Sequence, residues 1–195
     1  FLNPLASGLK LGAYSLSEPQ SGSDASNMKT FAEKNGNNYI VNGTKNWVTS
    51  GENSDLIIFF CKTEKGAGSK GISAFIIEKG TPGLTTGKKE EKLGIRASDT
   101  CELYFDNCEI PESNLIGNLG QGFSIAMQAL GGGRIGIASQ SVGLARAALD
   151  KTISYSRERE QFGQLIAKFG ATQNKIADMA TNIEAARLLV MPSLG

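Results

Sequence analysis

The sequence predicts an α+β protein in which a strand-rich part is followed by a pair of helices. Up to about residue 120, segments rich in Val, Ile, Phe, Tyr and Thr alternate with Gly, Asn, Pro and Ser clusters, which is typical of strands and turns. After residue 120, Ala, Gln, Arg and Leu dominate, and the apolar residues follow a helical period. With 195 residues, 40% of them hydrophobic, the chain is long enough to bury a core.

The strand-rich part contains seven segments with the composition of strands. They are Lys10–Ser17, Met28–Lys34, Tyr39–Ser50, Asp55–Lys62, Ile72–Glu78, Leu84–Glu91 and Cys101–Cys108. The sequence Gly36-Asn37-Asn38 predicts a hairpin turn between the second and third segments. Thr81-Pro82-Gly83 predicts another turn, and residues 110–114 are expected to close the strand-rich part.

Two helical segments follow. The first runs over Phe123–Tyr155 and ends in the charged run Arg157–Glu160. The second carries a stripe of apolar residues, namely Ile166, Phe169, Ile176, Ala180, Ile183 and Val190. Two such stripes pack most simply as an antiparallel pair. Because each glycine of Gly131-Gly132-Gly133 costs a helix about 1 kcal/mol, either the first helix breaks there or something approaches its backbone closely.

Composition excludes several classes of function. The chain has no histidine, so it has no Ser-His-Asp triad and no imidazole ligand, and a general base must be a carboxylate, a lysine, a tyrosine or a cofactor. A net charge of +1 argues against nucleic-acid binding. Cys61, Cys101 and Cys108 lack the spacing of a disulfide framework or a zinc site. The longest apolar run, Leu56–Cys61, is too short to span a membrane.

Four local patterns have a plain structural interpretation. The glycine pattern of residues 66–71 predicts a hairpin loop, and that of residues 131–136 lies within a helix, so neither indicates a dinucleotide-binding fold. The sequon Asn42-Gly43-Thr44 is interpreted as a turn between strands. Asp99, Glu102 and Asp106 are interpreted as a solvated strand edge and turn.

Two stretches are more informative. In residues 14–24 a strand ends at a hydroxyl residue, and a Pro/Gly loop rich in N–H groups and hydroxyls follows, which suits a phosphate or the polar rim of a heterocycle. A self-capping turn is the alternative. Residues 46–50 carry the single tryptophan, Trp47. A lone Trp in a strand is usually a core residue, but beside a planar cofactor it supplies a stacking wall, with Thr49 as a hydrogen-bond partner.

These stretches together resemble the acyl-CoA dehydrogenase family. The motif Leu-Ser-Glu-Pro-x-x-Gly-Ser-Asp at residues 16–24 is followed by Asn-Gly-x-Lys-x-Trp-Val-Thr-Ser-Gly at residues 42–51. Further matches in family order are residues 92–98, 105–111, 133–140 and 155–163. The resemblance covers about residues 1–190, and the short-chain, butyryl-type branch is most similar.

The resemblance implies an architecture and domain boundaries. In the family, an antiparallel β-barrel-like middle domain lies between two helical domains. Residues 1–8 are then the tail of the N-terminal helical domain, and 9–117 form the middle domain that binds flavin and acyl-CoA. Residues 118–195 are the first two helices of an incomplete C-terminal bundle. The chain is expected to be truncated at both ends.

The resemblance also assigns residues to FAD and substrate. The FAD-binding positions are Tyr14, Leu16, Ser17, Ser23, Trp47, Val48, Thr49, Arg159 and Phe162, the last two reaching the cofactor of a neighbouring subunit. Ser17 bonds the pyrimidine rim of the flavin, Thr49 bonds near its N5 atom, and Trp47 flanks the rings. Ser23 and Arg134 contact the acyl-CoA.

The implied chemistry is α,β-dehydrogenation of a short-chain acyl-CoA thioester. A carboxylate takes the α-proton, the β-hydride passes to FAD, and the electrons leave through electron-transfer flavoprotein. This suits a chain without histidine. The implied protein is a homo-oligomer, commonly a tetramer, of fatty acid oxidation, in the bacterial cytoplasm or the mitochondrial matrix, with neither nucleic acid nor membrane as a partner.

Three positions depart from the family pattern. Gly133 stands where some branches carry the base carboxylate, which most branches carry in a region past residue 195. Gly131 replaces an acid that helps to hold substrate, and Gly170 replaces a glutamine that contacts a neighbour's FAD. The chain alone is therefore expected to lack dehydrogenase activity, and its exposed apolar stripes are expected to drive self-association.

Three alternatives stay open at this point. The chain can be a non-catalytic flavin or acyl-CoA binding module with the same fold. It can also belong to an acyl-CoA oxidase or nitroalkane oxidase type of flavoenzyme, which differs in the reaction of its reduced flavin with oxygen. The third alternative is a purely structural β protein.

Overall fold

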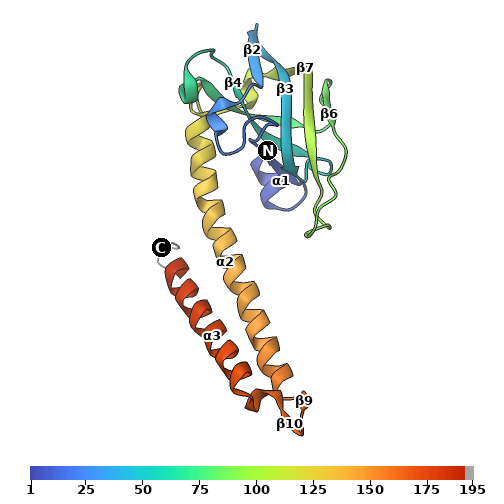
Figure 1. Cartoon of the computed structure of the whole chain (residues 1–195). Coiled ribbons are helices and arrows are strands. Elements are labelled where there is room, and N and C mark those ends of the chain that lie inside the picture. Colours follow the sequence, from blue (N-terminus) through green and yellow to red (C-terminus); the bar gives the residue numbers. More distant parts are fainter. Residues whose placement is uncertain (192–195) are drawn as a thin grey trace. The chain divides into compact units, whose positions relative to one another are not determined.

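The computed structural model describes residues 1–191, so the last four residues of the expected C-terminal segment lie outside the described residues. The chain divides into two compact units, a sheet unit of residues 1–127 and a helical unit from residue 128 onward (Figure 1). A short helix, α1 (Leu2–Ala6), precedes the first strand. None of the helices in the described range is both long and apolar enough to cross a membrane.

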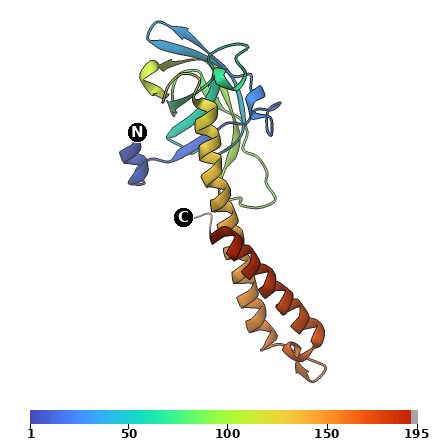
Figure 2. The same cartoon turned by 90° about the vertical axis from the view of Figure 1, so that its left-hand side faces the viewer.

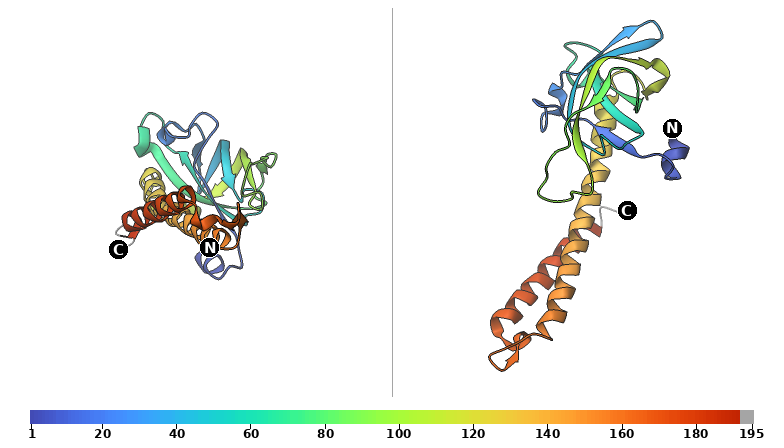
Figure 3. Two further views of the ribbon diagram at one scale, coloured as in Figure 1. Left: turned by 60° about the horizontal axis from the view of Figure 1, so that its bottom comes forward. Right: turned by 90° about the vertical axis from the view of Figure 1, so that its right-hand side faces the viewer.

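The sheet unit is built from eight strands. They are β1 (Gly12–Ser15), β2 (Phe31–Asn35), β3 (Asn38–Thr49), β4 (Leu56–Lys62), β5 (Ile72–Glu78), β6 (Leu84–Thr86), β7 (Thr100–Pro111) and β8 (Leu115–Ile116). Their order is β6-β7-β3-β2-β4-β5-β8, and β1 pairs with β4. The pairs are antiparallel except β1–β4 and β2–β4. The α+β class is therefore confirmed, while the pairings of the described strands leave the sheet open instead of closing it into a barrel (Figure 3).

Several predicted segment bounds and one predicted turn are wrong. The first two segments are shorter at their starts, where β1 begins at Gly12 and β2 at Phe31. β6 ends at Thr86 because the following residues, 87–99, carry a run of Lys and Glu without apolar alternation. β7 continues to Pro111, opposite Asn38 at the start of β3. Gly43 lies inside β3 at a register shift, with φ +151°, and a Cβ there would lie 2.4 Å from the Thr30 Oγ1 atom. Residues 42–44 are therefore part of β3, at a point where its backbone approaches Thr30 closely, and they do not form a turn.

Aromatic side chains form the centre of the sheet core. Phe59 packs against Phe75 and Phe105, with ring centroids 5.8 and 4.8 Å apart. The three cysteines are buried with their thiols free, and two of them, Cys101 and Cys108, lie on β7. β4 and β5 are buried over most of their length, whereas β7 alternates buried and exposed residues over its second half.

The helical unit contains most of α2 (Gly122–Ser156) and all of α3 (Gly170–Val190). A small hairpin, β9 (Glu160–Gln161) and β10 (Gln164–Leu165), joins the two helices. Figures 1 and 2 show α3 returning alongside α2, and an apolar groove of about 480 Å³ lies between them, lined by residues such as Val142 and Ile183. The helix does not break at Gly131–Gly133, and no atom of the described chain lies within 4 Å of a Cβ at these positions.

Candidate functional site

The two informative stretches of sequence meet at the C-terminal end of β3, which is an inner strand of the sheet. β1 leads into the loop of residues 16–30, and the C-terminal end of β3 runs beside the start of that loop. The Asn46 N–H donates to the Ser17 carbonyl oxygen at 2.8 Å, which joins the two segments directly. Residues 17 and 47 are thus held near one another by backbone contacts, although 29 residues separate them in the sequence.

Trp47 is exposed because of a β-bulge. In the β3–β7 ladder Lys45 pairs with Leu103 and Val48 pairs with Cys101, so two residues of β3 face one residue of β7. Trp47 has φ +59° in this bulge, and 61% of it is exposed. A left-handed backbone costs a residue other than glycine about 1–3 kcal/mol. The core interpretation of the lone tryptophan is therefore wrong, and the bulge turns the indole outward.

The two stretches carry hydroxyl side chains without a hydrogen-bond partner in the described residues. Ser17 is half-buried, Ser23 and Thr49 are exposed, and none of their hydroxyls hydrogen-bonds within residues 1–191. Leu16 and Val48 are buried, so they offer backbone groups only. These groups are donors and acceptors that a ligand can use.

Tyr14, which the resemblance assigns to FAD binding, has a side chain that is half-buried and hydrogen-bonded within the sheet unit. Its phenol donates to the Ala126 carbonyl oxygen at 3.3 Å, and its ring packs against Phe60 with centroids 5.1 Å apart. Burial raises the pKa of Tyr14 to about 12. The phenol therefore stays protonated, and its proton is already engaged within the sheet unit.

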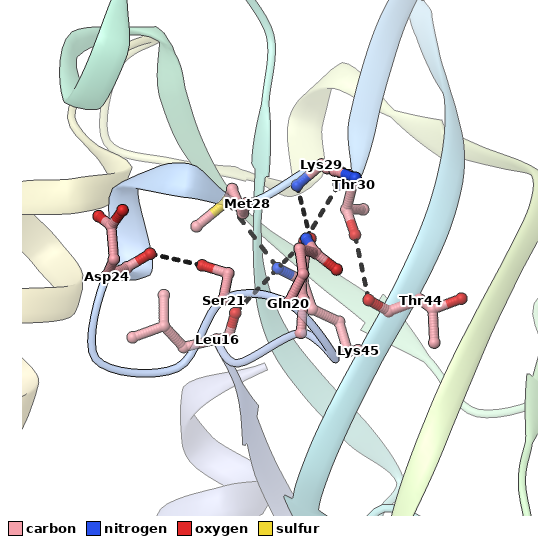
Figure 4. A network of polar contacts seen from close by, with 10 residues as sticks. Leu16, Gln20, Ser21, Asp24, Met28, Lys29, Thr30, Thr44 and Lys45 are labelled. Atoms are coloured by element: carbon pink, nitrogen blue, oxygen red, sulfur yellow. Dashed lines mark hydrogen bonds and ion pairs between the residues drawn. The ribbon is translucent and has the colours of Figure 1, made fainter.

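A buried ion pair lies beneath the site, and sequence reasoning did not assign it. The Lys45 Nζ lies 2.8 Å from the Glu18 Oε1. It also donates to the Leu16 carbonyl oxygen at 3.0 Å, and Figure 4 shows Lys45 with Leu16 and Met28 around it. Glu18 also accepts the N–H groups of Lys29 and Thr30. Both side chains are almost fully buried, with 0% and 2% exposed for Lys45 and Glu18. Glu18 lies in the motif of residues 16–24, and Lys45 lies in the motif of residues 42–51. A charged lysine within a strand, two positions before the tryptophan, was the sequence signal for this pair.

The electrostatics of this pair follow from its burial. Burial alone raises the pKa of Glu18, but the Lys45 ammonium and the hydrogen bonds from Lys29 and Thr30 outweigh it, so the pKa lies below its ordinary value. Burial also lowers the pKa of Lys45, and the Glu18 carboxylate opposes this change. The Glu18 carboxylate is therefore ionised at neutral pH.

Asp99 supports the turn that follows the site. Its carboxylate accepts the Glu52 N–H at 2.9 Å and the Asn53 Nδ2 at 2.8 Å, and only 4% of the residue is exposed. Burial alone raises the pKa of Asp99, but these hydrogen bonds together have the larger effect, so the pKa lies below its ordinary value. Asp99 is thus not part of a solvated edge, while Asp106 is exposed and Glu102 half-buried as expected.

The other predicted site residues belong to the helical unit. Arg134 is exposed on α2, and Arg159 is exposed just before β9. Phe162, 95% exposed, and Gly163 form the two-residue turn of the β9–β10 hairpin, with φ +51° and +76°. Positive φ at both positions is the type I′ turn, which favours Asn-Gly over Phe-Gly. These three residues therefore belong to the helical unit, and the other predicted site residues belong to the sheet unit.

The sheet-unit surface suits a planar, polar heterocycle. It offers one flat aromatic face, several uncommitted hydroxyls and backbone groups, and a rigid support underneath. Within residues 1–191 no group of three or more acidic, Cys or His side chains could hold a metal ion. The donor set thus fits the isoalloxazine ring of a flavin, whose faces are apolar and whose rim takes hydrogen bonds.

Comparisons with known proteins agree with this fit. The sequence profile described as “Acyl-CoA dehydrogenase, middle domain” matches residues 13–108, and “Acyl-CoA dehydrogenase, C-terminal domain” matches residues 120–194. A relative from Megasphaera elsdenii, “Acyl-CoA dehydrogenase, short-chain specific”, is 50% identical over 191 residues, which are 97% of this chain and 50% of the relative.

Two solved structures are similar over nearly the whole chain. Butyryl-CoA dehydrogenase from Megasphaera elsdenii matches with a TM-score of 0.95 and 50% identity, covering 98% of this chain and 50% of that one. A structure described as “Electron transferring flavoprotein of Acidaminococcus fermentans: Towards a mechanism of flavin-based electron bifurcation” holds a chain with a TM-score of 0.95, 51% identity and the same coverage. The chain thus spans about half the length of the relatives it matches.

Proposed function

The chain belongs to the acyl-CoA dehydrogenase family, and from that premise we propose that its sheet unit holds the flavin of an FAD-dependent acyl-CoA dehydrogenase. The observation that carries the proposal is Trp47, which a bulge holds outward in a left-handed conformation beside hydroxyls without a partner. Strain of this kind persists only where the surrounding structure imposes it, and it gathers at functional sites.

Each residue of this surface has a distinct task in the proposal. Ser17 and Thr49 hydrogen-bond the rim of the flavin and set its orientation, while Trp47 covers ring surface and keeps water away from it. When bound, FAD supplies the acceptor for the hydride that leaves the substrate β-carbon. Ser23 and Arg134 hold the polar part of an acyl-CoA thioester, where a guanidinium suits phosphate oxygens.

The finer parts of the function are also proposals. The relative and the structure from Megasphaera elsdenii are named for short-chain and butyryl substrates, which supports a short acyl chain here. The Acidaminococcus fermentans structure is named for electron transferring flavoprotein, which supports that protein as electron acceptor. Arg159 and Phe162 contact FAD of a second subunit in a homo-oligomer. The compartment is the bacterial cytoplasm or the mitochondrial matrix.

Residues 1–195 on their own are proposed to bind FAD without completing the reaction. The position before Arg134 is Gly133, which bears no carboxylate to take the α-proton, and Gly131 offers none to the substrate either. Apart from the neighbouring backbone of α2 itself, no described atom lies within 4 Å of a Cβ added at either glycine, so no other group of the described residues replaces the absent carboxylate there.

The test is an anaerobic titration of the FAD-loaded 195-residue chain with butyryl-CoA in the presence of a dye acceptor. We expect a retained visible flavin band and no dye reduction. Steady dye reduction would contradict the proposed inactivity, and failure to retain flavin would contradict the flavin site. Rapid reaction of the chemically reduced flavin with oxygen would favour the oxidase alternative.

A further inference from the structure

The Lys45–Glu18 pair is placed to control the geometry between the two halves of the site. Lys45 contacts the loop on both sides of Ser17, because its Nζ donates to the Leu16 carbonyl oxygen at 3.0 Å and to the Glu18 carboxylate at 2.8 Å. The next residue of β3, Asn46, donates its N–H to the carbonyl oxygen of Ser17 itself. Three consecutive loop residues are therefore tied to two consecutive residues of β3.

The same stretch of β3 leads directly into the bulge. Asn46 accepts the Trp47 N–H on its own Oδ1 at 2.8 Å, and Trp47 is the residue with φ +59°. Val48, which is 1% exposed, fixes the other end of the bulge in the core. A change in the position of the Lys45 side chain is therefore expected to alter the backbone conformation both at Ser17 and at the start of the bulge.

Burial of a full ion pair needs a reason other than stability. Removing two charges from water costs more than their attraction commonly returns, and a well-packed apolar pair is often equally stable. Here the carboxylate is fully used, since it accepts the N–H groups of Lys29 and Thr30 and the amide of Gln20 as well as the ammonium. These directional contacts favour one conformation of the loop of residues 16–30, because each donor and acceptor has a defined partner.

We propose, on the basis of the proposed function, that Lys45 and Glu18 are positioning residues that hold the Ser17 hydroxyl at the correct place relative to the Trp47 indole for flavin binding. Neither side chain touches the cofactor, because both are buried beneath the surface. Their contribution is preorganisation: the loop meets the ring without first having to be ordered.

The test uses the 195-residue chain, in which Trp47 is the only tryptophan and so reports on this site alone. The double variant Lys45→Met/Glu18→Gln removes both charges and leaves no bare buried ion. We expect a folded protein with the wild-type circular dichroism spectrum, a shifted apo Trp47 emission maximum, and FAD binding weakened about two- to tenfold, which corresponds to the loss of about one net hydrogen bond. The matched control is Lys34→Met/Glu112→Gln, which removes an exposed pair.

The outcomes separate this proposal from the function on which it rests. Weak FAD binding by the wild-type chain would contradict the proposed function, while the apo Trp47 emission still tests the positioning. Unchanged emission and unchanged FAD affinity in the double variant would overturn the positioning role. If the double variant does not fold, Glu18→Gln alone, which keeps the shape of the side chain, is measured in the same way. Failure of both variants to fold would also overturn the proposal, because the pair would then serve the whole unit.

Discussion

Two exposed aromatic residues with left-handed backbones, Trp47 and Phe162, show how differently the two units present a side chain. Trp47 follows the fully buried Lys45 and precedes the buried Val48, so the surrounding sheet dictates its conformation. Phe162 lies between exposed neighbours at the tip of a two-residue turn. The sheet unit thus holds Trp47 between buried residues, whereas the helical unit presents Phe162 at a turn, where its ring contacts only the edge-to-face ring of Phe169 among the described aromatic residues.

The largest effect that this difference predicts is at Lys45. Lys45→Met alone leaves the Glu18 carboxylate buried without its counter-charge, which is expected to destabilise the sheet unit by about 3–5 kcal/mol. Urea denaturation followed by circular dichroism measures this loss. Lys34→Met breaks an exposed pair with Glu112 and is expected to change the midpoint very little. Equal losses in the two variants would contradict the importance that we give to burial.

Glycines of the two units are expected to respond with opposite signs. Gly43→Ala places a Cβ against the backbone of Thr30 at a φ of +151°, and we expect a loss of about 2–4 kcal/mol. Gly133→Ala meets nothing within 4 Å in the middle of α2, so we expect a gain of about 0.5–1 kcal/mol. Thermal unfolding of both variants decides the point. A loss of stability in Gly133→Ala would show that another group packs closely against α2 at this position and that a side chain there obstructs it.

Acid is expected to affect the sheet unit through Glu18. Its pKa in the folded protein lies below the ordinary value of 4.5, so the unfolded chain binds more protons between these two values. The stability that the ionised carboxylate contributes is therefore complete above about pH 4.5 and is lost as the pH falls through the lower, folded pKa. Urea midpoints between pH 7 and pH 3 should fall steeply in the wild type and less steeply in Glu18→Gln. Identical slopes would contradict this assignment.

The two strained aromatics offer the smallest effects. Asparagine tolerates the left-handed region, so Trp47→Asn and Phe162→Asn are each expected to stabilise the chain by about 1 kcal/mol. Trp47→Asn should also weaken FAD binding, whereas Phe162→Asn should leave it unchanged in a monomeric preparation. Thermal unfolding and retention of the visible flavin band measure both properties. Destabilisation by Trp47→Asn would mean that the indole contributes more contact energy than the strain costs.

Pattern reasoning located the strands and helices well because their signals are local. The short apolar runs of β4 and β5 and the helical period after Phe123 can be recognised from neighbouring residues alone. The bulge at Trp47, the crossing at Gly43 and the burial of Asp99 depend on which strand lies opposite, and no local period reports that. Sequence reasoning therefore named Trp47, Ser17 and Thr49 through the family resemblance, while it missed the Lys45–Glu18 support beneath them.

The central claim is that the surface around Trp47, at the C-terminal end of β3, is the flavin site. One titration tests this claim directly. FAD is added to the 195-residue chain while the emission of Trp47, its single tryptophan, is recorded. We predict saturable quenching with one FAD per chain, and weaker quenching in Ser17→Ala. Emission that stays unchanged while the same sample retains a visible flavin band would contradict the claim, because the cofactor would then be bound away from Trp47.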